Sequence, residues 1–122
     1  DKFCSFLNGF KTNKTGYIEN IQKAAKLIKS NLFRPPYGRL KPSQARSIIS
    51  KGYKIVMWDV LSADFDISVT PEKCLKNVLS KTSSGSIIVM HDSYKAKDKI
   101  FYALPKILSY FTEKGYVFKS ID

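Results

Sequence analysis

Hydrophobic and polar residues along this chain fall into alternating segments of helical and extended pattern. From residue 16 to residue 30, apolar residues recur every three or four positions, which predicts an amphipathic helix, and Asn13 is one of several residues able to cap its start. A second helix is predicted to begin at Pro42 and to stop at Gly52, because proline suits the first helical position and glycine suits the end. Its apolar side contains Ala45, Ile48 and Ile49.

The second half of the chain predicts two more helices. Thr70, Pro71 and Glu72 supply in order a cap, a proline at the first helical position and an acid in the first turn. The buried side of this helix is predicted to contain Cys74, Leu75, Val78 and Leu79. A last helix is predicted over about residues 102–114, so that Pro105 falls in the first turn, where proline is tolerated. Its inward side is predicted to contain Leu104, Ile107, Leu108 and Phe111.

Short apolar runs between the helices predict strands at residues 32–33, 53–58, 86–90 and 116–121. Strands and helices therefore alternate with short connections, which is typical of an α/β protein with a parallel sheet and helical crossovers. A closed eight-unit barrel takes about 250 residues. Since the chain has 122 residues, the prediction is a partial barrel or an open sheet.

Length and composition bound the number of domains and the compartment. A chain of 122 residues with 43% hydrophobic residues can bury one core, so a single domain over residues 1–122 is predicted. No apolar run approaches the roughly 18 to 20 residues needed to cross a bilayer, so no membrane span is expected. The first residues are too polar for a signal peptide, but a processed chain would look the same, so the localisation stays open. Cys4 and Cys74 match no paired spacing, which favours two unlinked thiols.

The charge of the chain is strongly positive. Its formal net charge of +11 would attract anionic partners such as nucleic acid or acidic glycans. However, the lysines are spread along every segment and only 3 of the 21 basic residues are arginine, whereas nucleic-acid sites cluster basic residues and favour arginine. Solvated helix faces are therefore the preferred interpretation, and a basic module for nucleic acid or acidic glycans is the less favoured alternative.

Three predicted strands end in polar side chains. Arg34 follows the first strand and is held in extended geometry by two prolines, Asp59 and Asp64 follow the second, and His91 and Asp92 follow the third. Because the carboxyl ends of parallel strands meet at one edge, these side chains are expected to converge where α/β folds place their catalytic groups. The alternative is structural, since such aspartates often cap the next helix and a lone histidine often only bonds a carbonyl.

Three segments, in chain order, resemble motifs of a known family. Residues 33–38 (FRPPYG), 58–65 (WDVLSADF) and 87–92 (IIVMHD) resemble the third, fourth and fifth motifs of the polysaccharide deacetylases, the NodB-homology domains of carbohydrate esterase family 4. The resemblance extends from Gly9 to Ile121. It implies the C-terminal portion of a distorted, incomplete (β/α) barrel that hydrolyses N- or O-acetyl groups of chitin-like or peptidoglycan sugars. The family generally uses a divalent metal, usually zinc, and is often found at the cell surface or outside the cell.

The resemblance also implies roles for individual residues. His91 would be the general acid, and Asp64 would hold its imidazole in the right orientation. Arg34 would form one wall of the groove and orient the catalytic base, and the backbone N–H of Tyr37 would face the developing oxyanion. Phe65 stands where the family usually has tryptophan, and a flat apolar ring there is able to stack on a sugar. The pocket for the acetyl methyl group would be shaped by Ile87 and Val89.

Two features of the family are missing from this sequence. The first motif, an Asp-Asp pair that supplies the base and a metal ligand, is absent, and the two metal-binding histidines of the second motif correspond to Lys2 and Phe6. His91 is the only histidine of the chain. No metal-ligating residue is therefore assigned, and the chain alone is expected to be inactive or nearly so, whether it is part of a longer deacetylase or a degenerate relative.

A non-catalytic carbohydrate-binding module is the alternative from a different functional class, with Tyr37, Trp58 and Phe65 as stacking platforms. The expected partner, for the deacetylase and for the binding module, is an N-acetylated polysaccharide. Without the first strands of the barrel, a sheet edge and apolar helix faces would be exposed, so self-association is predicted.

Overall fold

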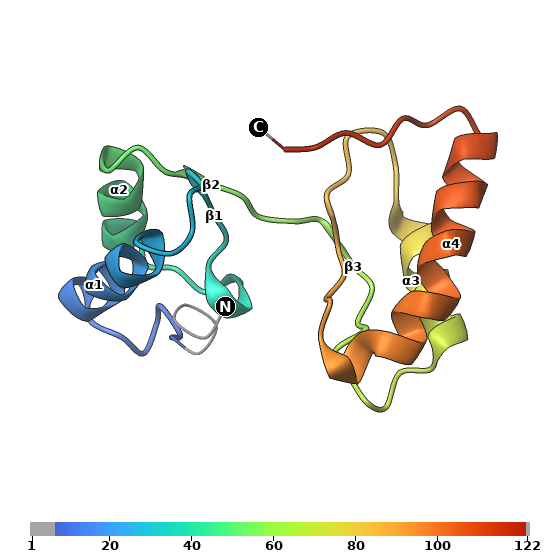
Figure 1. The fold of residues 1–122 in the computed structure, drawn as a ribbon, viewed down its shortest axis with the longest axis horizontal. Helices are drawn as coiled ribbons and strands as arrows, with labels where there is room; N and C mark the ends of the chain where they lie inside the picture. Colours follow the sequence, from blue (N-terminus) through green and yellow to red (C-terminus); the bar gives the residue numbers. More distant parts are fainter. Residues whose placement is uncertain (1–6, 122) are drawn as a thin grey trace. The chain divides into compact units, whose positions relative to one another are not determined.

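The computed structural model describes residues 7–121, which form two compact units (Figure 1). The first unit ends at Met57 and the second begins at Trp58. Within the described residues, each unit contains two α-helices and one pair of short parallel strands. One domain over residues 1–122 stays a prediction.

In the N-terminal unit, helix α1 (Lys14–Ala25) begins at the predicted cap, where the Asn13 side chain accepts a hydrogen bond from the Gly16 backbone N–H at 2.8 Å. Its buried side contains Tyr17, Ile18, Ile21 and Ala24. The predicted extension of this helix beyond Ala25 is wrong. Leu27 and Ile28 are 72% and 42% exposed, so the packing of these side chains would add little stability to a longer helix.

Strands β1 (Leu32–Phe33) and β2 (Lys54–Ile55) pair in parallel, with Leu32 opposite Lys54. Both lie inside predicted strand segments, although β2 is shorter than predicted. Helix α2 (Pro42–Ser50) connects the two strands and starts at the predicted proline. This unit is therefore a βαβ arrangement preceded by α1.

The core of the N-terminal unit is a small cluster of buried side chains from its helices and β1, namely Tyr17, Ile18, Ile21, Phe33 and Ile48. Gln44 of α2 is buried beside them, and its Nε2 donates to the carbonyls of Gly9 and Thr12 at 2.9 and 3.0 Å. The predicted apolar side of α2 is therefore right only in part. Ile48 is buried, but Ile49 is 59% exposed and the polar Gln44 takes a buried position.

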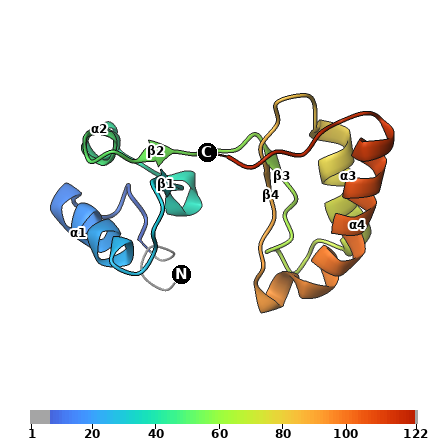
Figure 2. The same cartoon turned by 45° about the horizontal axis from the view of Figure 1, so that its top comes forward.

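In the C-terminal unit, strands β3 (Val60–Leu61) and β4 (Ile88–Val89) pair in parallel, with Val60 opposite Ile88. Helices α3 (Pro71–Lys81) and α4 (Lys97–Glu113) lie on one side of this strand pair (Figures 1 and 2). One core joins β3 with both helices through Val60, Cys74, Val78, Ala103, Ile107 and Phe111.

Helix α3 agrees with its prediction. The Thr70 side chain accepts a hydrogen bond from the Lys73 backbone N–H at 3.1 Å, and Pro71 is the first helical residue. Cys74 and Val78 are fully buried, and the other two residues of the predicted apolar side, Leu75 and Leu79, pack against the core while remaining half-buried.

Helix α4 differs from its prediction because it begins at Lys97 rather than near residue 102. Pro105 consequently lies inside the helix, not in its first turn. The carbonyl that Pro105 leaves without an intrahelical donor belongs to Phe101, whose side chain is 72% exposed, so water can reach this part of the helix. Leu104 and Leu108, predicted to face inward, are 37% and 41% exposed.

One strand of this unit is missed by the prediction, and one predicted strand is wrong. Strand β3 is not predicted by the sequence, because two apolar residues inside residues 58–65 are too few to set a strand period. Residues 116–121 form no strand. Tyr116 instead packs against the core of the unit, and Val117 is 76% exposed.

The predicted fold class is confirmed. The strands pair in parallel in both units, and a helix links the strands of each pair, which is a partial (β/α) arrangement. Within the described residues the strands form two separate two-stranded sheets rather than one continuous sheet. Over residues 7–121, no helix is both long and apolar enough to cross a bilayer.

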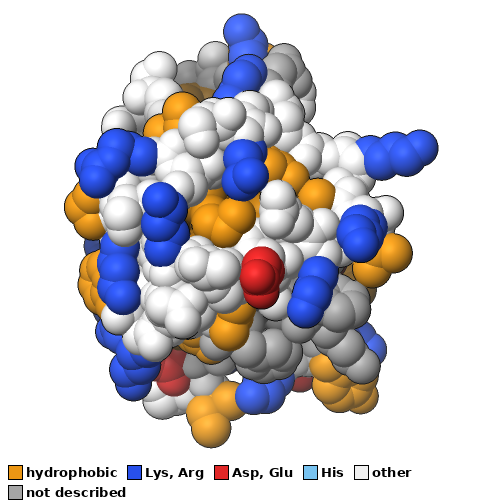
Figure 3. Space-filling model, turned by 90° about the vertical axis from the view of Figure 1, so that its left-hand side faces the viewer, with side chains coloured by type: hydrophobic (Ala, Val, Ile, Leu, Met, Phe, Trp, Pro, Cys, Tyr) orange, Lys and Arg blue, Asp and Glu red, His pale blue; other side chains and the backbone are white. Residues whose placement is uncertain are grey.

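On the face drawn in Figure 3, Lys and Arg side chains are spread over the surface, and several of them lie near one another along the left side of the view. A nucleic-acid site would gather such side chains into one patch or stripe. The less favoured alternative of a nucleic-acid-binding module stays a prediction.

Candidate active site

Asp64 and His91 lie together at the carboxyl ends of β3 and β4. Because these strands are parallel neighbours, the turn after β3 and the residues after β4 leave the sheet at the same edge. His91 Nδ1 lies 2.8 Å from Asp64 Oδ1, and the His91 backbone N–H donates to Asp64 Oδ2 at 2.5 Å. Both carboxylate oxygens of Asp64 are thus bound by one residue.

The two members of this pair differ in exposure. The Asp64 side chain is fully buried, whereas the His91 side chain is 42% exposed. An ionised carboxylate only accepts hydrogen bonds, so the His91 nitrogen that faces an ionised Asp64 carries a proton. Nε2 is then the nitrogen that remains for a ligand, where it accepts a hydrogen bond when the ring is neutral and donates one when the ring carries a second proton.

Phe65 borders the exposed side of His91. The two rings meet edge to face, with centroids 5.5 Å apart and an angle of 83° between the planes. Phe65 is 48% exposed, so part of its ring is available to a ligand. Of the two residues predicted to shape an acetyl pocket, Val89 is buried in β4 and Ile87 is half-buried just before this strand.

The turn over residues 62–66 that carries Asp64 is held by hydrogen bonds of its own. The Asp64 backbone N–H donates to the Ser62 hydroxyl at 3.3 Å, and the Asp66 backbone N–H donates to the Ala63 carbonyl at 3.1 Å. Ala63 has a φ of +64°, in the left-handed region that a residue with a Cβ seldom adopts.

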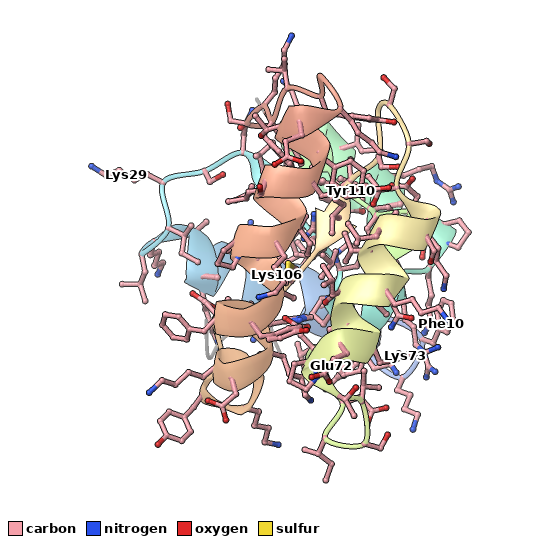
Figure 4. The ribbon with its side chains drawn as sticks, turned by 90° about the vertical axis from the view of Figure 1, so that its right-hand side faces the viewer. Phe10, Lys29, Glu72, Lys73, Lys106 and Tyr110 are labelled. Atoms are coloured by element: carbon pink, nitrogen blue, oxygen red, sulfur yellow. The ribbon has the colours of Figure 1, made fainter. Side chains whose placement is uncertain are left out.

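Two side chains that the sequence does not single out hold this turn from the helices. Asn77 of α3 donates to the Ser62 carbonyl at 3.1 Å, and Lys99 of α4 donates to the carbonyls of Asp64, at 3.2 Å, and of Asp66. Figure 4 shows α3 and α4 side by side. Neither residue belongs to one of the three motifs. The sequence therefore does not indicate that Asn77 and Lys99 hold the turn, and the burial of Lys99 is known only from the structure.

Asp59 does not belong to this edge, contrary to the expectation from the sequence. It precedes β3, so it lies at the opposite end of the strand from Asp64. Its carboxylate accepts hydrogen bonds from the Ile87 backbone N–H at 2.6 Å and from the Ser86 hydroxyl at 2.9 Å. These bonds hold the pKa of Asp59 below its usual range, and they tie the start of β4 to the start of β3.

Arg34 and Tyr37 belong to the N-terminal unit, whereas Trp58 belongs to the C-terminal unit. Arg34 follows β1 and its Nε donates to the Val56 carbonyl at 3.2 Å, within the N-terminal unit. Tyr37 is 62% exposed and has a φ of +60°. Trp58 is half-buried and is the first residue of the C-terminal unit. The convergence of Arg34 with His91 stays a prediction.

A metal site is not formed by the residues that the structure describes. Over residues 7–121, no group of three or more His, Cys, Asp or Glu side chains comes together in a way that could hold a metal ion. The positions that correspond to the family's metal-binding histidines, Lys2 and Phe6, lie outside the described residues, as does Cys4. The divalent metal that the family resemblance implies therefore finds no fitting ligand set among residues 7–121.

Comparison with known proteins relates the chain to deacetylases. No family model matches it. It is 29% identical over 92 residues to the peptidoglycan-N-acetylglucosamine deacetylase of Bacillus cereus, which covers 75% of this chain and 43% of that protein. It is 34% identical over 64 residues to the bifunctional xylanase/xylan deacetylase of Cellvibrio japonicus, which covers 52% of this chain and 9% of that protein. The chain thus spans less than half the length of either relative.

The fold gives the same relation. A crystal structure of a peptidoglycan N-acetylglucosamine deacetylase matches with a TM-score of 0.89 and 26% sequence identity. The match covers 96% of this chain and 57% of that chain. In sequence and in fold, the chain is therefore similar to the polysaccharide deacetylases of carbohydrate esterase family 4, the NodB-homology domains.

Proposed function

We propose that this chain contributes the acid side of a deacetylase site that acts on N-acetylated polysaccharides of the chitin or peptidoglycan kind. The observation that carries the proposal is the His91–Asp64 pair, in which a buried carboxylate holds a partly exposed imidazole. The activity named for the Bacillus cereus relative supports this choice of substrate. Because the chain spans 43% of that relative, the proposal concerns the activity of a larger site.

His91 is proposed as the general acid of amide hydrolysis. When its ring is protonated, Nδ1–H donates to Asp64 and Nε2 carries the second proton. As the tetrahedral adduct collapses, the carbon–nitrogen bond breaks and its electron pair goes to the amine nitrogen. Nε2 gives its proton to that nitrogen, so the amine leaves neutral and the ring returns to its neutral Nδ1–H form.

Aromatic and backbone groups are proposed to complete the site. The exposed part of the Phe65 ring, beside His91, suits stacking on a sugar. The Tyr37 backbone N–H makes no hydrogen bond within the described residues, so it is available to the oxyanion. Arg34 is proposed to orient the catalytic base. Further substrate contacts are proposed for Trp58, Ile87 and Val89.

No role in activating the attacking water is assigned to the described residues. Residues 7–121 offer neither a fitting metal-ligand set nor the Asp-Asp motif that provides the family's base. No step is therefore assigned to a metal. We expect this chain alone to release acetate from chitin oligomers at or near the background rate.

Binding of a chitin tetrasaccharide, followed by NMR, tests the proposed acid side. The signals of the His91 and Phe65 rings should shift with the N-acetylated oligomer and shift much less with the fully deacetylated glucosamine oligomer. Phe65→Ala should weaken binding about tenfold, which corresponds to about 1.4 kcal/mol. Asp92→Asn, which changes an exposed carboxylate next to His91, is the matched control and should bind like the wild type.

Two outcomes would contradict the proposal. Ring shifts that avoid His91 and Phe65, or equal affinity for both oligomers, would remove the assignment to an acetylated sugar. Acetate release at enzymatic rates by this chain alone, with zinc supplied, would show that the base and the metal ligands are present after all.

A carbohydrate-binding module without catalysis is the second candidate, and the exposure of Phe65 favours it as well. This candidate uses aromatic stacking and has no need of the imidazole. Affinity that survives His91→Ala but falls with Phe65→Ala would favour the binding module over the deacetylase.

A further inference from the structure

Lys99 is a buried lysine next to the proposed site, and the proposed reaction does not use it. The residue is 8% exposed, and its Nζ donates to the backbone carbonyl of Asp64, at 3.2 Å, and to that of Asp66. Burial of an ammonium group is costly unless its N–H donors are bound. Two of its three donors have a carbonyl partner here, so the contacts account for the burial.

The position of Lys99 in its helix gives no independent reason for a lysine. It is in the first turn of α4, where the positive end of the helix dipole disfavours a cation. Farther along the same helix, the buried positions are taken by residues such as Ala103 and Ile107. The lysine is therefore best explained by the turn that it contacts.

That turn needs support from outside. Ala63 is held at a φ of +64°, which is unfavourable for a residue with a Cβ. Asn77 binds the carbonyl before Ala63, and Lys99 binds the carbonyl of the residue after it. Each helix of the unit thus fixes one side of the strained residue, and the Asp64 carboxylate that reaches His91 starts from this fixed backbone.

We propose that Lys99 is a positioning residue for the His91–Asp64 pair. By holding the carbonyls of Asp64 and Asp66, it keeps the Asp64 carboxylate where both oxygens reach His91. The catalytic meaning of this positioning rests on the proposed function, whereas the positioning itself is a property of the folded chain.

The tautomer of His91 provides a direct readout by ¹⁵N NMR of the ring nitrogens. Since His91 is the only histidine, its ring signals need no assignment to a residue, and only Nδ1 and Nε2 have to be told apart. In the wild type at a pH of about 8.5, where a free imidazole is neutral, we expect the Nδ1–H form to dominate. Lys99→Met keeps the length of the side chain but removes its donors, so it should shift the ring toward the mixture of tautomers found in free histidine. Asp64→Asn should also change the ring signals and shows the size of a full effect.

Lys97→Met is the matched control, because Lys97 lies two residues earlier in α4 and is exposed. It should leave the His91 signals unchanged. If Lys99→Met lowers the melting temperature but leaves the tautomer as in the wild type, Lys99 has only a structural role and the proposal is wrong. If this variant does not fold, the Lys99 ammonium signal of the wild type decides: slow proton exchange supports the contact, and fast exchange refutes it.

Failure of this inference is separable from failure of the proposed function. The tautomer is measured without any sugar, so an unchanged ring in Lys99→Met refutes the positioning role even if chitin oligomers bind at His91. Conversely, a changed ring supports the positioning role even if chitin oligomers do not bind at His91.

Discussion

Asp64 is bound by His91 through both carboxylate oxygens, once by the ring and once by the backbone. Hydrogen bonds to an ionised acceptor are about twice as strong as those between neutral groups, so this residue fixes the end of β4 as well as the imidazole. The sequence predicts the ring contact from the two motifs. It does not predict the backbone contact, which depends on the register that places Val60 opposite Ile88.

Cys74 offers a prediction at the same scale. Its thiol is fully buried between α3 and the core, and burial raises its pKa. Because the thiolate is the reactive form, alkylation should need an opening of the C-terminal unit. In a Cys4→Ala variant, whose single thiol is Cys74, iodoacetamide should react more than about 100-fold slower in buffer than in denaturant. Similar rates in both conditions would show that Cys74 is accessible in the folded chain.

Among the elements, the helix starts that carry a capping side chain are predicted well. Asn13 and Thr70 cap their helices through side-chain oxygens, a local chemistry that the sequence displays directly. The end of α1 and the start of α4 depend on which apolar side chains pack in the core. The local sequence pattern does not predict this packing. Strand β3 is missed for a related reason, since its two residues become a strand only by pairing with β4.

The junction at the starts of β3 and β4 should give the C-terminal unit a dependence on pH. The pKa of Asp59 is lowered in the folded state, so its contribution to stability is complete above the unfolded value of about 3.9 and is lost as the pH falls through the folded value. The melting temperature of the wild type should therefore drop more between about pH 5 and about pH 3 than that of Asp59→Asn.

Asp92→Asn is a suitable control for this experiment, because Asp92 is exposed and accepts no hydrogen bond within the described residues. Its melting curve should follow the wild type across the same pH range. An Asp59→Asn variant with the same loss of stability as the wild type would mean that the carboxylate does not hold the two strands together.

At the scale of the whole chain, the succession of strands and helices predicts the parallel α/β class. The three motifs carry the resemblance to the deacetylase family. What the sequence cannot supply is the contact between elements that are distant along the chain. Lys99 is 35 residues from Asp64, and Asn77 is 15 residues from Ser62, so their roles become visible only when α3 and α4 pack on β3. Such pairs follow from tertiary packing rather than from a local spacing rule.

The exposed apolar residues support the prediction that the chain self-associates. Each sheet has only two strands within the described residues, which leaves backbone edges unpaired, and several large apolar side chains are solvent-exposed. Among them are Leu27, Ile67, Phe101 and Val117. Light scattering coupled to size-exclusion chromatography should show a mass that rises with concentration. A constant monomer mass up to about millimolar concentration would refute this prediction, and a Leu27→Lys, Phe101→Lys variant should move toward the monomer.

The double contact between His91 and Asp64 has a consequence for evolution. A change of the imidazole to any side chain other than proline removes only one of the two bonds, because the bond to Oδ2 comes from the backbone N–H of residue 91. Loss of the imidazole therefore leaves the two strand ends joined and the buried carboxylate still partly bound. One mutation at this position can thus remove the side chain proposed as the general acid while the contact that joins the two strand ends is kept.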